Sequence, residues 1–273
     1  MNIVCIGAHP DDCEFHAGGA AVLWARAGFR VLFVSMTNGD AGHHEMGGGP
    51  LARRRKQEAE AAARIAGVET RVLEYHDGEL APSIDVRREV VGIIREWNAD
   101  CVVTHRPWDY HPDHRYTAIL VQDSAYMVMV PNFCPEVTPL RKNPVFMYMV
   151  DRFQKPYPFR PDVAVDVSDA MDTKWSMLDA MDSQVYEWLP WTQDVLEKVP
   201  EDPVDRLSWL KQHYEPVFHQ YTALARPGLA AWYGADEAKR IVFAEAFEIC
   251  EYGRVPTKEE LYALFPFIPN ERA

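Results

Sequence analysis

The sequence predicts an α/β fold, a Rossmann-like three-layer sandwich with a parallel sheet between helices and additional helices at the C-terminal end. Short apolar runs alternate with segments of helical periodicity through the first half of the chain, which is the pattern of right-handed βαβ units. The 273 residues, 48% of them hydrophobic and 25% charged, fit one elaborated globular domain. We expect residues 1–130 to form its βα core and residues 131–273 an elaborated, mainly helical C-terminal part.

Four strands and four helices are expected to alternate in the core. The strands are the apolar runs at residues 2–8, 30–36, 70–75 and 100–104. The helices follow at residues 17–27, 50–66, 83–97 and 114–129. Gly28 and Gly67 come directly after the first two helices, where glycine favours a left-handed cap. Pro50 suits the first turn of the second helix, and Ser83 suits the N-cap of the third.

The second half of the chain carries a weaker pattern. Two further strands are expected at residues 145–150 and 163–167. One helix is expected to begin at residue 168, and two later helices are expected at residues 204–213 and 236–250. Residues 186–203 are rich in tryptophan and proline and fit neither period.

Composition limits the class of partner. The formal net charge is −13, with 41 acidic against 28 basic residues, and this charge opposes binding to nucleic acid or anionic membranes. No apolar run approaches the ~20 residues that span a bilayer, and the first residues lack the pattern of a secretion signal. We therefore expect a cytoplasmic protein that binds neither nucleic acid nor membrane. The five cysteines show no C-x-x-C spacing, which argues against a disulfide scaffold or a thiolate zinc finger.

Two short histidine-carboxylate clusters stand where predicted strands end. The first is AHPDD at residues 8–12, and the second is HPDH at residues 111–114. In a doubly wound sheet of order 3-2-1-4-5, the first and fourth strands flank the switch point, and ligands bind beyond their carboxyl ends. Polar segments at residues 37–40 and 76–78 leave the second and third strands on the same edge. We therefore expect the two clusters to meet in one site.

His9, Asp12 and His114 are the expected metal ligands. A catalytic zinc ion typically takes three ligands from His and Asp or Glu and keeps one position for water, and another divalent transition metal would fit the same ligands. Asp11 is then free to accept the proton of that water as general base. The pattern predicts metal-assisted hydrolysis.

His111 is the expected stabiliser of a tetrahedral oxyanion, or the acid that protonates a departing amine. Asp113 is expected to hold the His111 imidazole through its second nitrogen and to favour the cationic form. These groups suit amide hydrolysis. Direct attack by water is expected, because the sequence has neither a G-x-S-x-G elbow nor a cysteine nucleophile motif.

The remaining histidines and Cys13 fit structural roles better. Structural or solvated positions are expected for the histidines at 16, 43, 44, 76, 105 and 213. Cys13 follows the first cluster, yet the carboxylate and imidazoles beside it serve a hydrolytic metal better. His219 is less well supported as a residue that faces the site.

The first strand-to-helix turn reads GAHPDD instead of GxGxxG, which argues against NAD or flavin binding.

The motifs resemble those of the PIG-L/LmbE-like family of zinc-dependent de-N-acetylases. The resemblance rests on AHPDD at 8–12, TNGDAG at 37–42, Arg55-x-x-Glu58 and HPDH at 111–114. It implies a Rossmann-like fold and hydrolysis of an N-acetyl group, commonly on an N-acetylglucosamine moiety of a larger molecule. It also implies the metal ligands and the base named above, with Arg55 and Asp77 as contacts to sugar hydroxyls.

Three hypotheses follow. The first is a zinc-dependent N-deacetylase that acts on a small-molecule N-acetylated sugar conjugate, and we expect it to form a homo-oligomer. Trp108, Tyr110 and residues 186–191 could cover the apolar faces of such a sugar, or pack in the core or a subunit contact. The alternative enzyme is a metal-dependent phosphoesterase for a small phosphorylated metabolite, which the acidic composition disfavours. The third hypothesis, a structural metal in an interaction protein, would call for four ligands rather than three.

Overall fold

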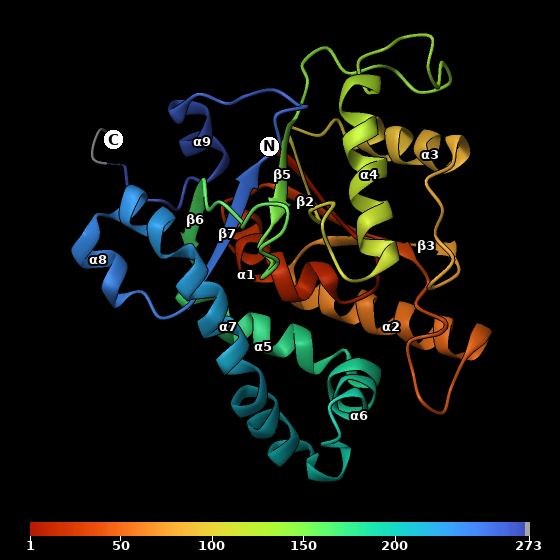
Figure 1. Ribbon diagram of the computed structural model, residues 1–273, viewed down its shortest axis with the longest axis vertical. Helices are drawn as coiled ribbons and strands as arrows, with labels where there is room; N and C mark the ends of the chain where they lie inside the picture. The colour runs from red at the N-terminus through yellow and green to blue at the C-terminus, as the bar shows by residue number, and fades with distance from the viewer. Residues whose placement is uncertain (271–273) are drawn as a thin grey trace.

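The computed structural model describes residues 1–270 and shows a seven-stranded mixed sheet with helices on both faces (Figure 1). The sheet order is β3-β2-β1-β4-β5-β7-β6. The strands are β1 (Asn2–Gly7), β2 (Arg30–Thr37), β3 (Glu69–Tyr75), β4 (Cys101–Thr104), β5 (Val145–Met149), β6 (Val163–Asp166) and β7 (Ala244–Ile249). The first five strands pair in parallel in the order 3-2-1-4-5, so the predicted α/β class and the predicted position of the switch point are confirmed.

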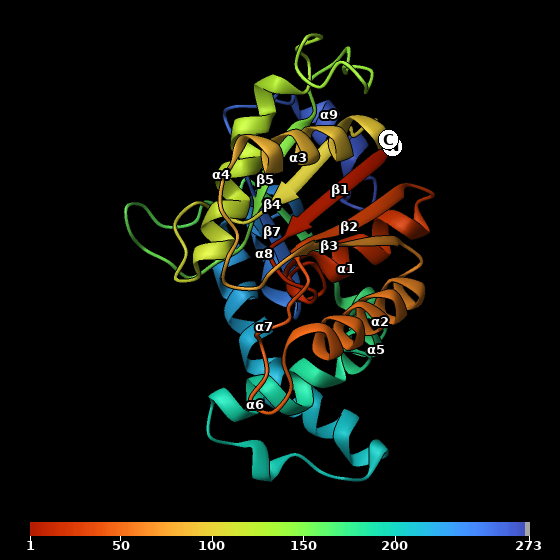
Figure 2. The same cartoon turned by 90° about the vertical axis from the view of Figure 1, so that its right-hand side faces the viewer.

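The helices form a layer on each face of this sheet. They are α1 (Asp12–Arg26), α2 (Gly48–Ala66), α3 (Ile84–Glu96), α4 (Pro112–Met127), α5 (Met171–Asp179), α6 (Leu189–Thr192), α7 (Pro203–Tyr233), α8 (Ala235–Arg240) and α9 (Lys258–Leu264). Figure 2 shows α3 and α4 on one face of the sheet and α1 and α2 on the other. Short 3-10 turns lie at Ser168–Ala170 and Leu196–Lys198. Within residues 1–270, none of the helices has the length and hydropathy needed to cross a bilayer.

Several local predictions hold in detail. Gly67 caps α2 in the left-handed conformation with a φ of 71°, which costs glycine little. The Ser83 side chain accepts from the Val86 N–H at the start of α3. The predicted start of α1 is wrong by five residues, because the helix begins at Asp12 and not at Ala17, and this places the Asp12 carboxylate in the first helical turn.

The predicted helix at 236–250 is wrong. The chain forms only the short α8 there and then β7, which runs antiparallel to both β5 and β6. The segment AEAFEI looks helical because alanine and glutamate favour helices, but pairing in the sheet overrides that propensity. Glu245 is buried in β7, where Lys174 and the N–H groups of Gly19 and Ala20 bind its carboxylate. The sheet is therefore mixed rather than wholly parallel.

Helix α7 is much longer than predicted. It spans Pro203–Tyr233, although Pro216 and Pro227 lie inside it. The predicted helix ended at residue 213, although a proline inside a helix usually costs about 3 kcal/mol and two are accommodated here. The unassigned stretch from 186 forms a π-helical turn at Ser183–Trp188, followed by the short α6. These two elements and α7 carry residues that line the functional site.

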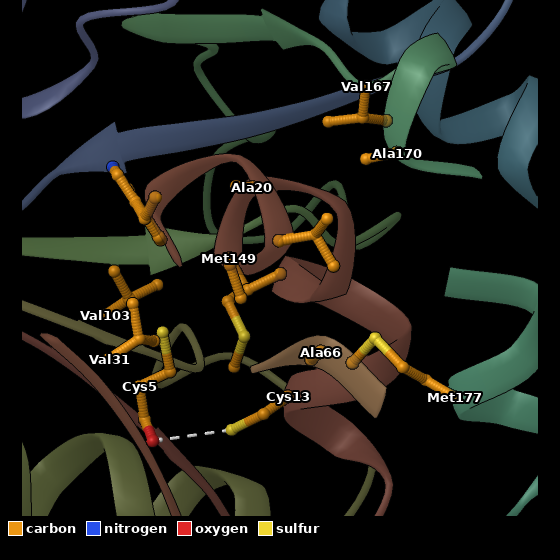
Figure 3. Close-up of a cluster of buried hydrophobic side chains, with 14 of the residues drawn as sticks. Cys5, Cys13, Ala20, Val31, Ala66, Val103, Met149, Val167, Ala170 and Met177 are labelled. Carbon is orange, nitrogen blue, oxygen red and sulfur yellow. Dashed lines mark hydrogen bonds between the residues drawn. The ribbon is translucent and has the colours of Figure 1, made fainter. Parts of the chain in front are cut away.

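Buried apolar residues form three clusters, of which the two larger ones lie on opposite sides of the sheet and the third packs α7 and α8 against β6 and β7. In β1, Ile3 and Cys5 belong to one cluster, and Val4 and Ile6 belong to the other, as the two-residue period of a strand requires. Figure 3 shows part of the first cluster, in which the thiol of Cys13 donates to the backbone carbonyl of Cys5 at 3.4 Å. Cys13 therefore packs in the core, as expected.

Candidate metal and active site

The two histidine-carboxylate clusters meet at the carboxyl ends of β1 and β4. These strands are neighbours, with Ile6 paired to Thr104, so the segments that follow them leave the same edge of the sheet. Nδ1 of His9 lies 3.2 Å from Nε2 of His114. The Asp12 carboxylate lies 3.6 Å from the first of these nitrogens and 3.4 Å from the second. The predicted convergence of side chains about a hundred residues apart in sequence is confirmed.

This triangle fits a divalent metal ion. Tetrahedral ligands that sit about 2.0–2.2 Å from zinc lie roughly 3.3–3.5 Å from one another. The two nitrogens are 3.2 Å apart, and each lies near one oxygen of Asp12, Oδ2 at 3.6 Å from His9 and Oδ1 at 3.4 Å from His114, so these separations bracket that value. All three side chains are buried yet line a cavity, so one side of the triangle is open to a substrate. Three overlapping groups of side chains here could hold a metal ion: His9 with His111 and His114, Asp12 with His105 and His114, and His9 with Asp77 and Asp113.

Asp12 is fixed by its place at the start of α1. Its Oδ2 accepts from the N–H groups of Ala8 and His9, each at 2.8 Å. Burial favours the neutral carboxyl, but the His114 and His105 imidazoles prevail and hold the pKa of Asp12 well below its ordinary value. Asp12 is therefore an anion, as a metal ligand must be.

His105 is a site residue that the sequence did not reveal. Its Nε2 lies 3.1 Å from Oδ2 of Asp12, and its ring stacks on His114 with centroids 4.1 Å apart. His105 is buried and not solvated, and the expectation of a structural or solvated residue did not include this contact. The available signal was position, because His105 follows β4 directly at the edge where the clusters were expected to meet.

Carboxylates contact both His9 and His114. Nδ1 of His114 is 3.2 Å from Asp109, and Nε2 of His9 is 3.1 Å from Asp77 and 3.4 Å from Asp113. Such outer carboxylates fix the tautomer and orientation of a metal-bound imidazole. Asp109 was not among the predicted site residues, and Asp77 was expected only as a sugar contact.

The contacts of Asp113 differ from the expected ones. Its carboxylate approaches His9 and accepts from the N–H groups of Gly78 and Leu80, so it is turned toward the loop after β3. The contact with His111 is made by the Asp113 backbone N–H, which donates to Nδ1 of His111 at 3.2 Å. Burial and the His9 and His114 imidazoles lower the pKa of His111, which favours a neutral ring rather than the expected cation.

Asp11 lines the cavity together with His9, Asp12 and His114. It adopts a φ of 145°, which is uncommon for a residue other than glycine, and it lies at the N-cap of α1. Its carboxylate approaches Arg55 at 3.4 Å. Burial raises the pKa of Asp11 to about 6, although Arg55 opposes this shift.

Arg55 is a buried residue that joins several loops of the site. Its guanidinium donates to the carbonyls of Pro10 and Gly39, and it lies 3.7 Å from Asp77. Both Arg55 and Asp77 line the cavity, at the positions expected for them by resemblance. The close approach of the guanidinium to Gly39 leaves no room for a side chain there, because an added Cβ would lie 2.4 Å from Nη1.

The cavity has a volume of about 1060 Å³ and extends from the ligand triangle to α6 and α7. Of the expected aromatic residues, Tyr110 and Trp188 line it. Trp191 stacks on Trp188 with centroids 5.3 Å apart and is half exposed.

Other candidate residues lie away from the cavity. Tyr186 is buried in the core, and Trp108 is exposed without lining the cavity. His219 contacts Glu215 and Phe243 and does not line it.

An ionic cluster of Arg54, His43 and Glu187 lies next to Trp188, which lines the cavity from the π-helical turn. Arg54 of α2 donates to both carboxylate oxygens of Glu187, and His43 lies 2.7 Å from the same carboxylate. These contacts outweigh partial burial and lower the pKa of Glu187 to about 2. The cluster thus ties the π-helical turn to α2 and to the loop after β2.

Replacing Glu187 with Gln is expected to destabilise the protein by about 1 kcal/mol at pH 7, because the pair is partly exposed and screened. The folded-state pKa is lower than the unfolded one, so this stabilisation is fully present above the unfolded value of about 4.3 and disappears as the pH falls toward 2. Urea unfolding of wild type and variant at pH 7 and at low pH measures the difference. A difference that does not shrink with acidification contradicts this assignment.

Known proteins match both the sequence and the fold. Residues 4–125 match the family model described as PIG-L, GlcNAc-PI de-N-acetylase. Diacetylchitobiose deacetylase of Thermococcus kodakarensis is 32% identical over 197 residues, which are 69% of this chain and 73% of that protein. The 4-oxalmesaconate hydratase of Pseudomonas putida is 24% identical over 71% of this chain and 78% of that protein. The structure of N,N′-diacetylchitobiose deacetylase from Pyrococcus horikoshii superposes with a TM-score of 0.69 at 27% identity, over 94% of this chain and 88% of that one.

Proposed function

The chain belongs to the PIG-L/LmbE-like family of de-N-acetylases, and from this premise we propose that it is a zinc-dependent hydrolase that removes the acetyl group from an N-acetylglucosamine-type sugar conjugate. The observation that carries the proposal is the close approach of His9, Asp12 and His114, with the Asp11 carboxylate, which is paired with Arg55, in the same cavity. When bound, zinc supplies a Lewis acid that polarises an acyl oxygen and makes water more acidic.

Asp11 accepts the proton of the attacking water. It is the carboxylate at the triangle that is committed to neither ligand histidine, and its pKa of about 6 lies close to neutral pH, where a general base works best. Attack of water on the acyl carbon and cleavage of the C–N bond release acetate and leave an amine on the sugar. Arg55, which contacts Asp11, also lies where it can meet the sugar together with Asp77.

His111 supports the oxygen that becomes negative. Because Nδ1 of His111 accepts the Asp113 N–H, the proton of the neutral ring sits on Nε2 and is free to be donated into the cavity. A neutral imidazole donor can stabilise an oxyanion without first being charged. Asp113 then acts on the site through His9, whose ring it helps to orient.

A phosphoesterase is a weaker fit to the same site. Asp11, Asp77, Asp109 and Asp113 surround the triangle, and this concentration of carboxylates repels a phosphate dianion. The acyl group of an amide is neutral and meets no such barrier.

Acetate release and metal analysis test the proposal. Protein reconstituted with zinc is incubated with N-acetylglucosamine, N,N′-diacetylchitobiose and larger N-acetylglucosamine conjugates, and parallel samples receive sugar phosphates. We expect bound zinc, acetate and an equal amount of new primary amine, without phosphate release. Zinc-loaded protein that releases phosphate, or that leaves every acetylated sugar intact, contradicts the proposal.

A further inference from the structure

Buried polar atoms of three cavity-lining residues, His16, Asp151 and Tyr214, have no hydrogen-bond partner within the described residues; we call this part of the cavity the α7 wall. The Tyr214 hydroxyl, Nδ1 of His16 and Oδ2 of Asp151 make no hydrogen bond within the described part of the chain. All three residues line the cavity, and they come from α7, α1 and the segment after β5. Buried polar groups in proteins are nearly always paired, because an unpaired one costs about 1–3 kcal/mol. Their shared position indicates that a bound ligand supplies the missing partners.

Aromatic rings separate these polar atoms. Tyr214 and Tyr221 are seven residues apart, which places them on one face of α7 about two turns from each other. The Tyr214 ring contacts Phe15 at 5.5 Å between centroids, and the Tyr221 ring contacts His16 at 5.4 Å. Phe15 and Tyr221 line the cavity as well. The wall thus combines flat apolar surfaces with hydrogen-bonding atoms, a combination that suits the faces and hydroxyls of a sugar.

The protonation states point to the same kind of ligand. Burial, with a smaller effect of Asp11, raises the pKa of Tyr214, so its phenol keeps its proton and can both donate and accept. The Nδ1 of His16 is buried at the cavity wall without a partner within the described residues, so it offers one hydrogen-bonding atom to a ligand. Oδ1 of Asp151 already accepts from Arg106 and from the Phe153 N–H, which leaves Oδ2 as a free acceptor. Neutral donors and acceptors beside a carboxylate favour hydroxyl groups over an anion.

The size of the cavity leaves room for more than one sugar ring. Its volume of about 1060 Å³ is at the upper end of the range that holds drug-sized ligands. We propose that Tyr214, His16 and Asp151 form a second hydroxyl-binding subsite, which receives the part of a carbohydrate substrate that lies beyond its N-acetylated ring. This inference rests on the proposed deacetylase function for the placement of that first ring near Asp11, Arg55 and Asp77.

Two conservative variants test the subsite. Tyr214→Phe removes one hydroxyl and keeps the ring, and Asp151→Asn keeps Oδ1 but replaces the free acceptor with a donor. For the zinc enzyme we expect each variant to lower kcat/KM for N,N′-diacetylchitobiose roughly 3- to 10-fold, mainly by raising KM, while kcat/KM for N-acetylglucosamine stays within about 2-fold. Tyr126→Phe is the matched control, because Tyr126 is exposed on α4 and does not line the cavity.

Calorimetry separates this inference from the proposed function. The dissociation constants of both sugars are measured with zinc-loaded Asp11→Asn protein, with and without Tyr214→Phe, so that the disaccharide survives the measurement. A selective weakening of disaccharide binding supports the subsite, even if wild type releases no acetate and the proposed function fails. Equal weakening for both sugars, unchanged binding, or no binding of either sugar overturns the subsite.

Discussion

Replacing Asp11 with Asn is expected to reduce turnover by ~10²-fold or more while the bound zinc is retained. The change preserves the shape of the side chain but removes its ability to take a proton. Asp11 contributes none of the three ligand atoms of the triangle, and its recorded ion pair is with Arg55, so metal binding has no direct reason to fail. Steady-state acetate release and metal content are measured on the same preparation.

The control for this variant is Asp85→Asn, an exposed carboxylate in the first turn of α3 that lies outside the cavity. It should leave both rate and zinc content unchanged. A full rate in the Asp11 variant would remove it as the base. Loss of zinc from that variant would show instead that Asp11 helps to bind the ion, and the assignment of Asp12 as the single carboxylate ligand would then be wrong.

The parallel half of the sheet was predictable because its signals are local. Gly67 and Ser83 mark helix ends by chemistry that does not depend on distant residues. Strand β7 was not predictable in this way, since its alanines and glutamates favour a helix and only the buried pairing of Glu245 with Lys174 explains a glutamate in the core. The long α7 was missed for the same reason, because packing against β6 and β7 stabilises it across two prolines.

The site also has a part that the sequence could predict and a part that it could not. The meeting of the two histidine-carboxylate clusters could be predicted because residues that follow neighbouring parallel strands share one edge of the sheet. The surrounding groups could not, since their roles depend on side-chain direction. Asp113 lies two residues after His111, yet at the start of α4 it turns toward the β3 loop and approaches His9. The wall of α7 joins the cavity only through the tertiary fold, so no spacing in the sequence connects Tyr214 with Asp151.

Replacing His114 with Ala is expected to abolish stoichiometric zinc binding. His114 offers Nε2 to the triangle, and without it only His9 and Asp12 remain of the three proposed ligands. Loss of an outer carboxylate commonly costs a metal site 10- to 100-fold in affinity, so loss of a direct ligand should cost more than about 100-fold. Asp109→Asn provides the graded comparison, because Asp109 contacts Nδ1 of His114 from behind.

Thermal unfolding with and without zinc measures this series independently of catalysis, since a ligand that binds only the folded state raises the melting temperature. We expect a large zinc-dependent shift for wild type, a smaller one for Asp109→Asn and none for His114→Ala. His219→Ala is the control, because that histidine is half exposed and lies away from the cavity. If His114→Ala retained the wild-type shift, the ion would have to bind elsewhere, and the approach of His9 to His114 would need another cause. The hydrogen bond between the two ring nitrogens, which lie 3.2 Å apart, would then be that cause. A zinc-dependent shift that is lost only with His114 supports instead the proposed ion bound by His9, Asp12 and His114.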